Sequence, residues 1–132
     1  MLSADAYRLG HGLIDSEHNL LFGLITELES RVREKDGHTI LADLMERLYS
    51  YAALHFSTED RLMAETNYPD IDNHRAEHES VLVGLRRLEA TFQSGGATAA
   101  EDTLQFMMLW VTNHIPNSDR KLADHLWQRR RQ

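Results

Sequence analysis

The chain has 132 residues and a mass of 15.2 kDa, which is the size of one domain. Its 42% hydrophobic and 27% charged residues are typical of a folded globular protein, and they exclude intrinsic disorder and collagen-like repeats. The absence of cysteine excludes disulfides, thiolate nucleophiles and sulfur-ligated metal clusters. A net charge of -7 argues against a nucleic-acid partner, because phosphate binding requires a clustered basic face.

Scarce glycine and proline divide the chain into long helical segments. We expect five helices, which cover about residues 15–35, 39–65, 71–93, 98–115 and 118–128. Asp15 or Ser16 could cap the first helix, Pro69 stands in the turn after the second, and Pro116 interrupts the fourth. No segment alternates apolar and polar residues as a β-strand does.

Each long segment carries an apolar stripe of residues three and four positions apart. This spacing, together with short connections, predicts an all-α fold, an antiparallel up-down-up-down four-helix bundle with a short C-terminal fifth helix. We expect a single domain over residues 1–132, in which residues 1–14 form an N-terminal arm, 15–117 the bundle and 118–132 the short C-terminal helix and tail.

The first ten residues lack the positively charged start and the continuous apolar stretch of a signal peptide. No apolar window reaches the roughly 18 residues that a membrane helix needs. We therefore expect a cytoplasmic protein with no membrane partner.

Histidine and carboxylate side chains fall on the inward stripes, where apolar residues are expected. Moving a polar group into a core without a partner costs on the order of 2 kcal/mol or more, and an ionised carboxylate costs far more. Glu59 lies one turn after His55, and no lysine or arginine occupies an inward stripe position. Glu59 must therefore be protonated, paired with a buried cation or bound to a metal ion.

Two further pairs extend this pattern. His74 and His78 are four residues apart, which places both on one face of a helix. Asp119 follows His114 by five residues, about 140° around an unbroken helix. We expect Pro116 to break the helix and let the chain fold back, so that both side chains face the interior. A helix N-cap is the competing interpretation of Asp119.

The polar groups that these stripes and pairs contribute are too many for one metal ion; they are His18, His55, Glu59, His74, His78, His114 and Asp119. With carboxylates as bridges, they suit two metal ions about 3.5 to 4 Å apart. Nitrogen and oxygen donors without sulfur are compatible with non-haem iron, zinc, manganese or copper. The paired Glu-x-x-His motifs of ferritin-like sites are absent, and a histidine-rich set favours reversible ligand exchange over high-valent chemistry. A metal-free bundle is the alternative, and it would require a protonated Glu59.

The order of these motifs resembles the hemerythrin family, specifically its single-domain bacterial members. A first-helix histidine is followed by HxxxE, HxxxH and HxxxxD, and the resemblance spans about residues 7–127. Neighbouring residues are also similar to the family, including Tyr68-Pro69 before HxxxH and Trp110 four residues before His114.

The resemblance implies two iron ions, Fe2+ or Fe3+, with a bridging oxo or hydroxo group. It implies that one iron is held by His74, His78 and His114 and the other by His18 and His55. The two irons would be bridged by Glu59 and Asp119. The second iron keeps a vacant position for O2. The implied function is reversible O2 binding for oxygen storage, delivery or sensing.

A dry O2 pocket is part of that expectation, with walls formed by Leu21, Phe56 and Trp110. Thr112, two residues before His114, stands where the family commonly has an apolar residue beside the open site. Its hydroxyl is expected to bond the ligand or to admit water. The remaining histidines match no ligand position and are expected on the surface; they are His11, His38 and His125.

Two alternative functions belong to other classes. A solvent channel at Thr112 would favour a di-iron oxidoreductase that acts on peroxide or nitric oxide. A non-catalytic sensory module would need an unidentified protein partner that reads a change in the first helix. Carriage of O2, without enzymatic turnover, is the leading interpretation.

Overall fold

The computed structural model describes residues 4–131, and this part of the chain contains no β-strand. Four long helices form its body: α1 (Gly12–Arg33), α2 (His38–Glu65), α3 (Ile71–Gln93) and α4 (Ala99–His114). A short 3-10 helix, η1 (Ala4–Tyr7), precedes them, and a π-helical turn, η2 (Ile115–Asp119), and helix α5 (Arg120–Arg131) follow.

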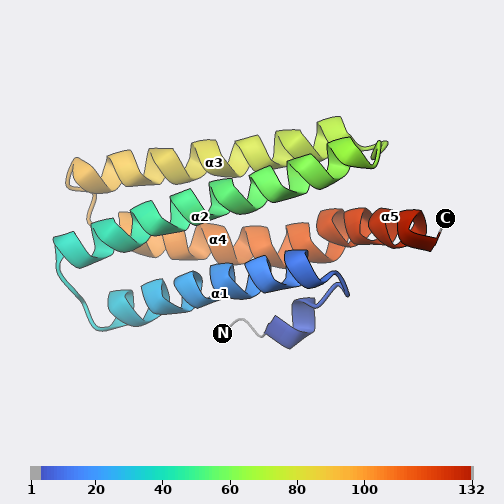
Figure 1. Ribbon diagram of the computed structural model, residues 1–132. Coiled ribbons are helices and arrows are strands. Elements are labelled where there is room, and N and C mark those ends of the chain that lie inside the picture. The colour runs from blue at the N-terminus through green and yellow to red at the C-terminus, as the bar shows by residue number, and fades with distance from the viewer. Residues whose placement is uncertain (1–3, 132) are drawn as a thin grey trace.

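Each long helix packs against its neighbours in sequence, and α4 closes the bundle by packing against α1 (Figure 1). The connections between the long helices are short, so consecutive helices run in opposite directions. This arrangement confirms the predicted up-down-up-down four-helix bundle with a C-terminal fifth helix.

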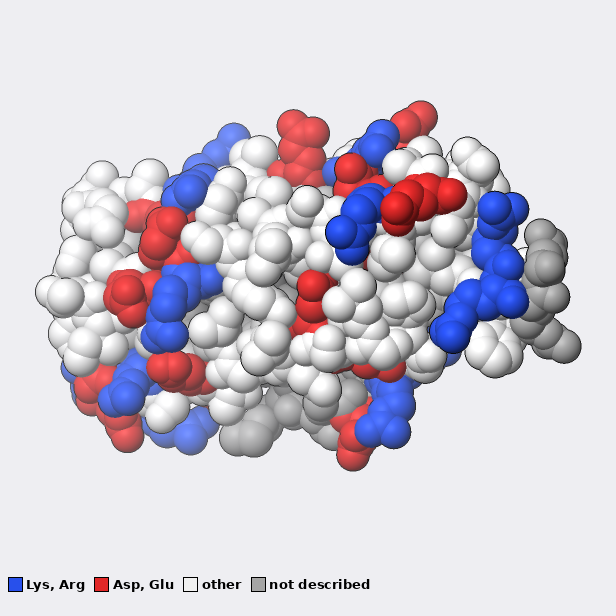
Figure 2. Space-filling view, viewed as in Figure 1, with Lys and Arg blue, Asp and Glu red and all other residues white. Residues whose placement is uncertain are grey.

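The helices are held by the inward stripes that the sequence predicts. The side chains that line the core are almost fully buried, among them Ile14, Leu21, Ile25, Leu28, Leu48, Leu85 and Met107. Acidic and basic side chains are interspersed on the face shown in Figure 2, and Arg86 pairs across α2 and α3 with Glu46 at 3.0 Å. Because such exposed pairs contribute little to stability, the apolar core holds the bundle together. None of the helices within residues 4–131 combines the length and apolarity needed to cross a bilayer.

The first helix begins earlier than predicted, because His11 caps it. The His11 Nδ1 accepts the backbone N–H of Ile14 at 3.3 Å. Asp15 lies inside the first turn, where its carboxylate accepts the backbone N–H groups of Leu9 and Gly10 at 2.8 and 3.0 Å. Asp15 therefore ties the N-terminal arm to the bundle instead of capping α1.

The chain does not fold back at Pro116, and that expectation is wrong. Helices α4 and α5 follow one another through η2 without a reversal (Figure 1). Within η2 the Arg120 N–H donates to the Ile115 carbonyl, the five-residue spacing of a π-helical turn. Because this turn is wider than an α-helical turn, residues five apart lie on nearly the same side, and Asp119 reaches the interior beside His114.

We predict that Leu28→Ala lowers the free energy of unfolding by about 2 to 5 kcal/mol, because this almost fully buried side chain leaves a cavity. Leu54→Ala on α2, where the leucine is 57% exposed, should change it by less than about 0.5 kcal/mol. Urea unfolding of the metal-free variants measures both. Equal losses would contradict the assignment of the inward stripe.

Candidate metal centre

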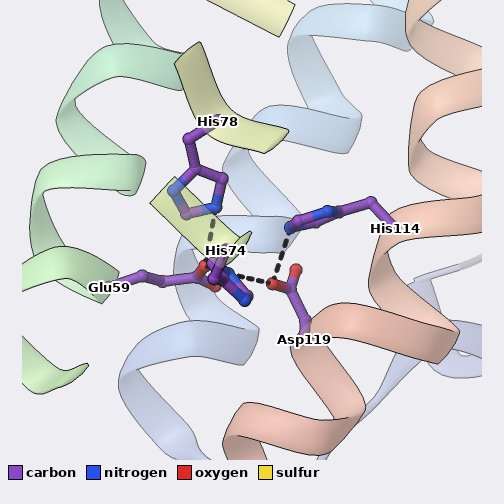
Figure 3. Close-up of side chains that lie close together, drawn as sticks. All are labelled: Glu59, His74, His78, His114 and Asp119. Atoms are coloured by element: carbon purple, nitrogen blue, oxygen red, sulfur yellow. Dashed lines mark hydrogen bonds and ion pairs between the residues drawn. The ribbon is translucent and has the colours of Figure 1, made fainter. Parts of the chain in front are cut away.

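The antiparallel order brings together the beginnings of α1 and α3 and the ends of α2 and α4. All seven predicted metal-site side chains lie at this end, each no more than 5% exposed: His18, His55, Glu59, His74, His78, His114 and Asp119. Figure 3 shows five of them, with Glu59 and Asp119 approaching one another from α2 and η2. Residues that lie up to about a hundred positions apart in sequence therefore share one buried cluster.

Glu59 directs its two carboxylate oxygens toward different histidines. Its Oε1 lies 2.8 Å from the His74 Nε2 and 3.1 Å from the His78 Nε2. Its Oε2 lies 3.1 Å from the His55 Nε2 and 3.8 Å from the His18 Nε2. One oxygen thus faces the α3 histidines, and the other faces the α1 and α2 histidines.

Asp119 repeats this division. Its Oδ1 lies 2.9 Å from the His114 Nε2 and 3.2 Å from the His74 Nε2, whereas its Oδ2 lies 3.1 Å from the His18 Nε2. Two groups of potential ligands result, and in each group the ligand atoms lie within 4.8 Å of one another. The groups share the two carboxylates; they are Glu59, His74, His78, His114 and Asp119, and His18, His55, Glu59 and Asp119.

Many polar atoms of this cluster have no hydrogen-bond partner. Within residues 4–131, the unpaired buried atoms in the cluster are Nδ1 of His18, Nε2 of His55, His78 and His114, Oε2 of Glu59, and both Oδ atoms of Asp119. Several of the histidine Nε2 atoms lie about 3 Å from a carboxylate oxygen but lack hydrogen-bond geometry. Metal-ligating atoms that point toward a common centre show this arrangement. Because buried polar groups are normally paired, these residues fit metal ions held between them.

Opposing effects act on the pKa values of this cluster. Burial and the nearby Glu59 charge would raise the pKa of Asp119, but the imidazoles of His114, His18 and His74, which lie within 3.2 Å of its oxygens, hold it at about 2. Burial would likewise raise the pKa of Glu59, yet the close imidazoles of His55, His74 and His78 hold it well below its usual value. Burial alone would lower the pKa of His55 and His74. The adjacent carboxylates have the larger, opposite effect, and both pKa values rise to about 9. Protons on the imidazoles therefore neutralise the carboxylates when no metal is bound.

Aromatic rings enclose part of the cluster. Phe56 stacks on the His78 imidazole with a centroid distance of 3.9 Å and an interplanar angle of 7°. Trp110 stacks on His114 at 4.3 Å and 17°, and it meets Phe56 edge-on at 5.2 Å. Leu21, one turn after His18 on α1, is fully buried in the same core. The three predicted wall residues therefore lie beside or close to the histidines.

Thr112 does not lie at the site, and the prediction that it stands beside an open position is wrong. Its side chain is exposed, and its hydroxyl donates to the Leu109 carbonyl at 3.0 Å. Residues two apart lie about 200° apart on a helix, so an inward His114 turns Thr112 outward. Val111, three residues before His114, is the fully buried side chain at this turn.

Two glutamates beside the cluster escaped sequence reasoning. The His55 Nδ1 lies 2.7 Å from the Glu17 Oε1, and the His114 Nδ1 lies 3.0 Å from the Glu77 Oε1. Each glutamate directly precedes a clustered histidine, and neither lies on an inward stripe. Their only sequence signal is a position at a helix seam, about 100° from an inward residue.

The other histidines lie outside the two ligand groups. His38 is exposed and stacks on Phe92 at 4.4 Å. His125 is half-buried, and its Nε2 lies 3.0 Å from the Thr66 carbonyl oxygen at the end of α2. His11, the α1 cap, is also half-buried, so all three lie at least partly at the surface and only His38 is fully exposed.

We predict that the metal-free protein loses stability as the pH rises from 6 to 9.5. The pKa values of His55 and His74 are about 9 when folded, against about 6.5 when unfolded. Their stabilising contribution is therefore complete below about pH 6.5 and is lost as the pH passes 9. Denaturant unfolding across this range measures the change, and the Zn2+-loaded protein should show a much smaller decline, since the metal replaces the protons. Metal-free stability that rises toward pH 9.5 would contradict the proton-neutralised cluster.

Comparison with known proteins relates this chain to hemerythrins. Residues 9–126 match the family model described as "Hemerythrin HHE cation binding domain". The chain is 29% identical over 109 residues to the bacteriohemerythrin of Methylococcus capsulatus, covering 83% of this chain and 82% of that protein. It is 28% identical over 122 residues to the myohemerythrin of Riftia pachyptila, covering 92% and 90%.

Solved structures show the same architecture. A crystal structure of wild-type hemerythrin matches with a TM-score of 0.84 and 26% sequence identity, covering 96% of both chains. A crystal structure of a hemerythrin mutant matches with a TM-score of 0.86 and 25% identity, covering 96% of this chain and 95% of that chain. The family match spans the bundle and both ligand groups, and the chain belongs to the hemerythrin HHE cation-binding family.

Proposed function

We propose that this protein binds O2 reversibly at a non-haem di-iron centre and serves in oxygen storage, delivery or sensing. The observation that carries this proposal is the division of Glu59 and Asp119, each of which turns one oxygen toward each group of histidines. Two carboxylates divided in this way suit a pair of bridged metal ions. Membership of the hemerythrin family, whose model is described as cation-binding, supports our choice of iron as the metal and O2 as the ligand.

The two groups differ in ligand number, and this difference creates room for an external ligand. One group has three histidines with the two carboxylates, and the other has two histidines, His18 and His55, with the same carboxylates. The second position therefore has one protein ligand fewer. We assign O2 binding to that position and a complete ligand shell to the first.

The charge of the ligand set favours reversibility. A di-iron centre held by these residues would supply two electrons to O2 and take them back on its release. The protein contributes two anionic carboxylates and five imidazoles, so it adds little negative charge to balance higher oxidation states. This balance favours return to the ferrous state over oxidative chemistry.

Apolar side chains protect the bound state by excluding water. Leu21 is fully buried, Phe56 is 4% exposed, and Trp110 covers His114 from the outer side of the core. Water and external protons would promote oxidation of the iron and loss of the reversible ligand. The low dielectric constant of surroundings without water also strengthens the electrostatic attraction between the buried carboxylates and the cations.

The competing function is turnover of peroxide or nitric oxide, and the structural feature that favoured it is not found at the site. That hypothesis relied on a hydroxyl or a solvent channel at Thr112, whose exposed side chain bonds the Leu109 carbonyl instead. The three residues proposed as pocket walls, Leu21, Phe56 and Trp110, are apolar or aromatic. Carriage of O2 is therefore the function that the geometry supports best.

Stopped-flow mixing of the iron-loaded, reduced protein with O2 tests this proposal. We predict a rapid spectral change that reverses completely when O2 is removed under argon, over repeated cycles. The metal-free protein, treated identically, provides the baseline. Irreversible oxidation in the first cycle, or steady turnover when peroxide or nitric oxide is supplied, would contradict carriage.

We predict that Phe56→Leu shortens the lifetime of the oxygenated protein several-fold, because the smaller side chain opens space beside His78. Phe92→Leu is the matched control, since Phe92 is also buried but packs in a separate cluster with Met45 and Ala99. The decay of the oxygenated absorption measures both lifetimes. Equal decay in the two variants would remove Phe56 from the pocket wall.

A further inference from the structure

We propose that Glu17 and Glu77 are positioning residues that hold His55 and His114 in the form that offers Nε2 to a metal ion. We further propose that Glu17 sets the metal affinity of the two-histidine position, the position to which we assign O2. This inference rests on the proposed di-iron centre and extends it to residues outside the ligand groups.

Glu17 is held firmly between α1 and α2. Its Oε1 lies 2.7 Å from the His55 Nδ1, and its Oε2 accepts the Thr58 hydroxyl at 3.0 Å. The side chain is 14% exposed. Since both oxygens are engaged by α2, the carboxylate fixes the orientation of the His55 ring.

Glu77 has the same relation to the other ligand group. Its Oε1 lies 3.0 Å from the His114 Nδ1, and the Ser118 hydroxyl bonds the same carboxylate at 2.7 and 3.0 Å. The Glu77 side chain is 45% exposed. Each ligand group therefore has one histidine whose Nδ1 is hydrogen-bonded to a carboxylate outside the group.

The hydrogen bonds determine which nitrogen can bind a metal. An ionised carboxylate can accept a hydrogen bond but cannot donate one. The Nδ1 of each histidine must therefore carry the hydrogen, and in the neutral ring Nε2 keeps the lone pair. In His55 and His114 alike, Nε2 is a buried atom without a hydrogen-bond partner within residues 4–131. The nitrogen left free is the one that faces Glu59 or Asp119.

The same contact strengthens the ligand. An imidazole that donates Nδ1–H to a carboxylate is a more basic ligand at Nε2, and losing such a partner typically weakens metal affinity about 10- to 100-fold. Glu17 should have the larger effect for two reasons. It is less exposed than Glu77 and so less screened by solvent, and its position has fewer other ligands.

Co2+ titration of the metal-free protein, followed by its absorption bands, tests this inference without O2. Glu17→Gln removes the charge but keeps an oxygen that can accept the Nδ1 hydrogen. We predict that it weakens the second equivalent of Co2+ about 10- to 100-fold and leaves the first nearly unchanged. Glu77→Gln should weaken the first equivalent, by a smaller factor. Glu27→Gln, on α1 but paired with Arg47 away from the cluster, should affect neither.

A spectroscopic signature separates positioning from general packing. In the Zn2+-loaded protein with 15N-labelled histidine, the Nδ1–H resonance of His55 should be shifted strongly downfield by its bond to the carboxylate. Glu17→Gln should move this resonance toward a normal position, whereas Glu77→Gln and Glu27→Gln should leave it in place.

The outcomes distinguish this inference from the proposed function. If the unaltered protein binds fewer than two Co2+ ions, the di-iron centre itself is contradicted. If it binds two, and Glu17→Gln binds both with unchanged affinity, the positioning role is overturned while the centre stands. Should Glu17→Gln fail to fold, Thr58→Val provides the test. It removes the hydroxyl that bonds Glu17, whose other contact is the Leu54 carbonyl within α2, and it should weaken the second equivalent by a smaller factor.

Discussion

Two carboxylates buried among five imidazoles impose the main physical constraint on this protein. Glu59 and Asp119 are almost completely removed from water, and ionised groups in such surroundings are stable only beside compensating positive charge. Protonated histidines supply that charge in the metal-free chain, and the orphaned ligand atoms fit two cations in their place. Metal binding and folding are therefore coupled at this cluster.

The bundle solves a geometric problem that this constraint creates. Antiparallel packing brings two helix beginnings and two helix ends to one place, so each helix needs to contribute only one or two ligands to its inward stripe. The π-helical turn η2 then adds Asp119 from beyond the end of α4. The resulting asymmetry, three histidines against two around shared carboxylates, is the basis of our proposal that one position binds a small ligand.

Sequence periodicity was sufficient to predict the bundle, because each inward stripe is a local property of one helix. The same stripes identified the histidines and Glu59 that the structure gathers together. Three-dimensional details were out of reach: Asp119 arrives through a widened helical turn instead of a broken helix, and Glu17 lies at a seam between helices. Thr112 was misplaced because its spacing from His114 was considered without its direction on the helix.

Anomalous X-ray diffraction from crystals of the iron-reconstituted protein, measured at the iron absorption edge, tests the central claim most directly. We expect two iron peaks between Glu59 and Asp119, one beside His74, His78 and His114 and the other beside His18 and His55. A single peak, peaks elsewhere in the chain, or no iron between the two carboxylates would contradict the account.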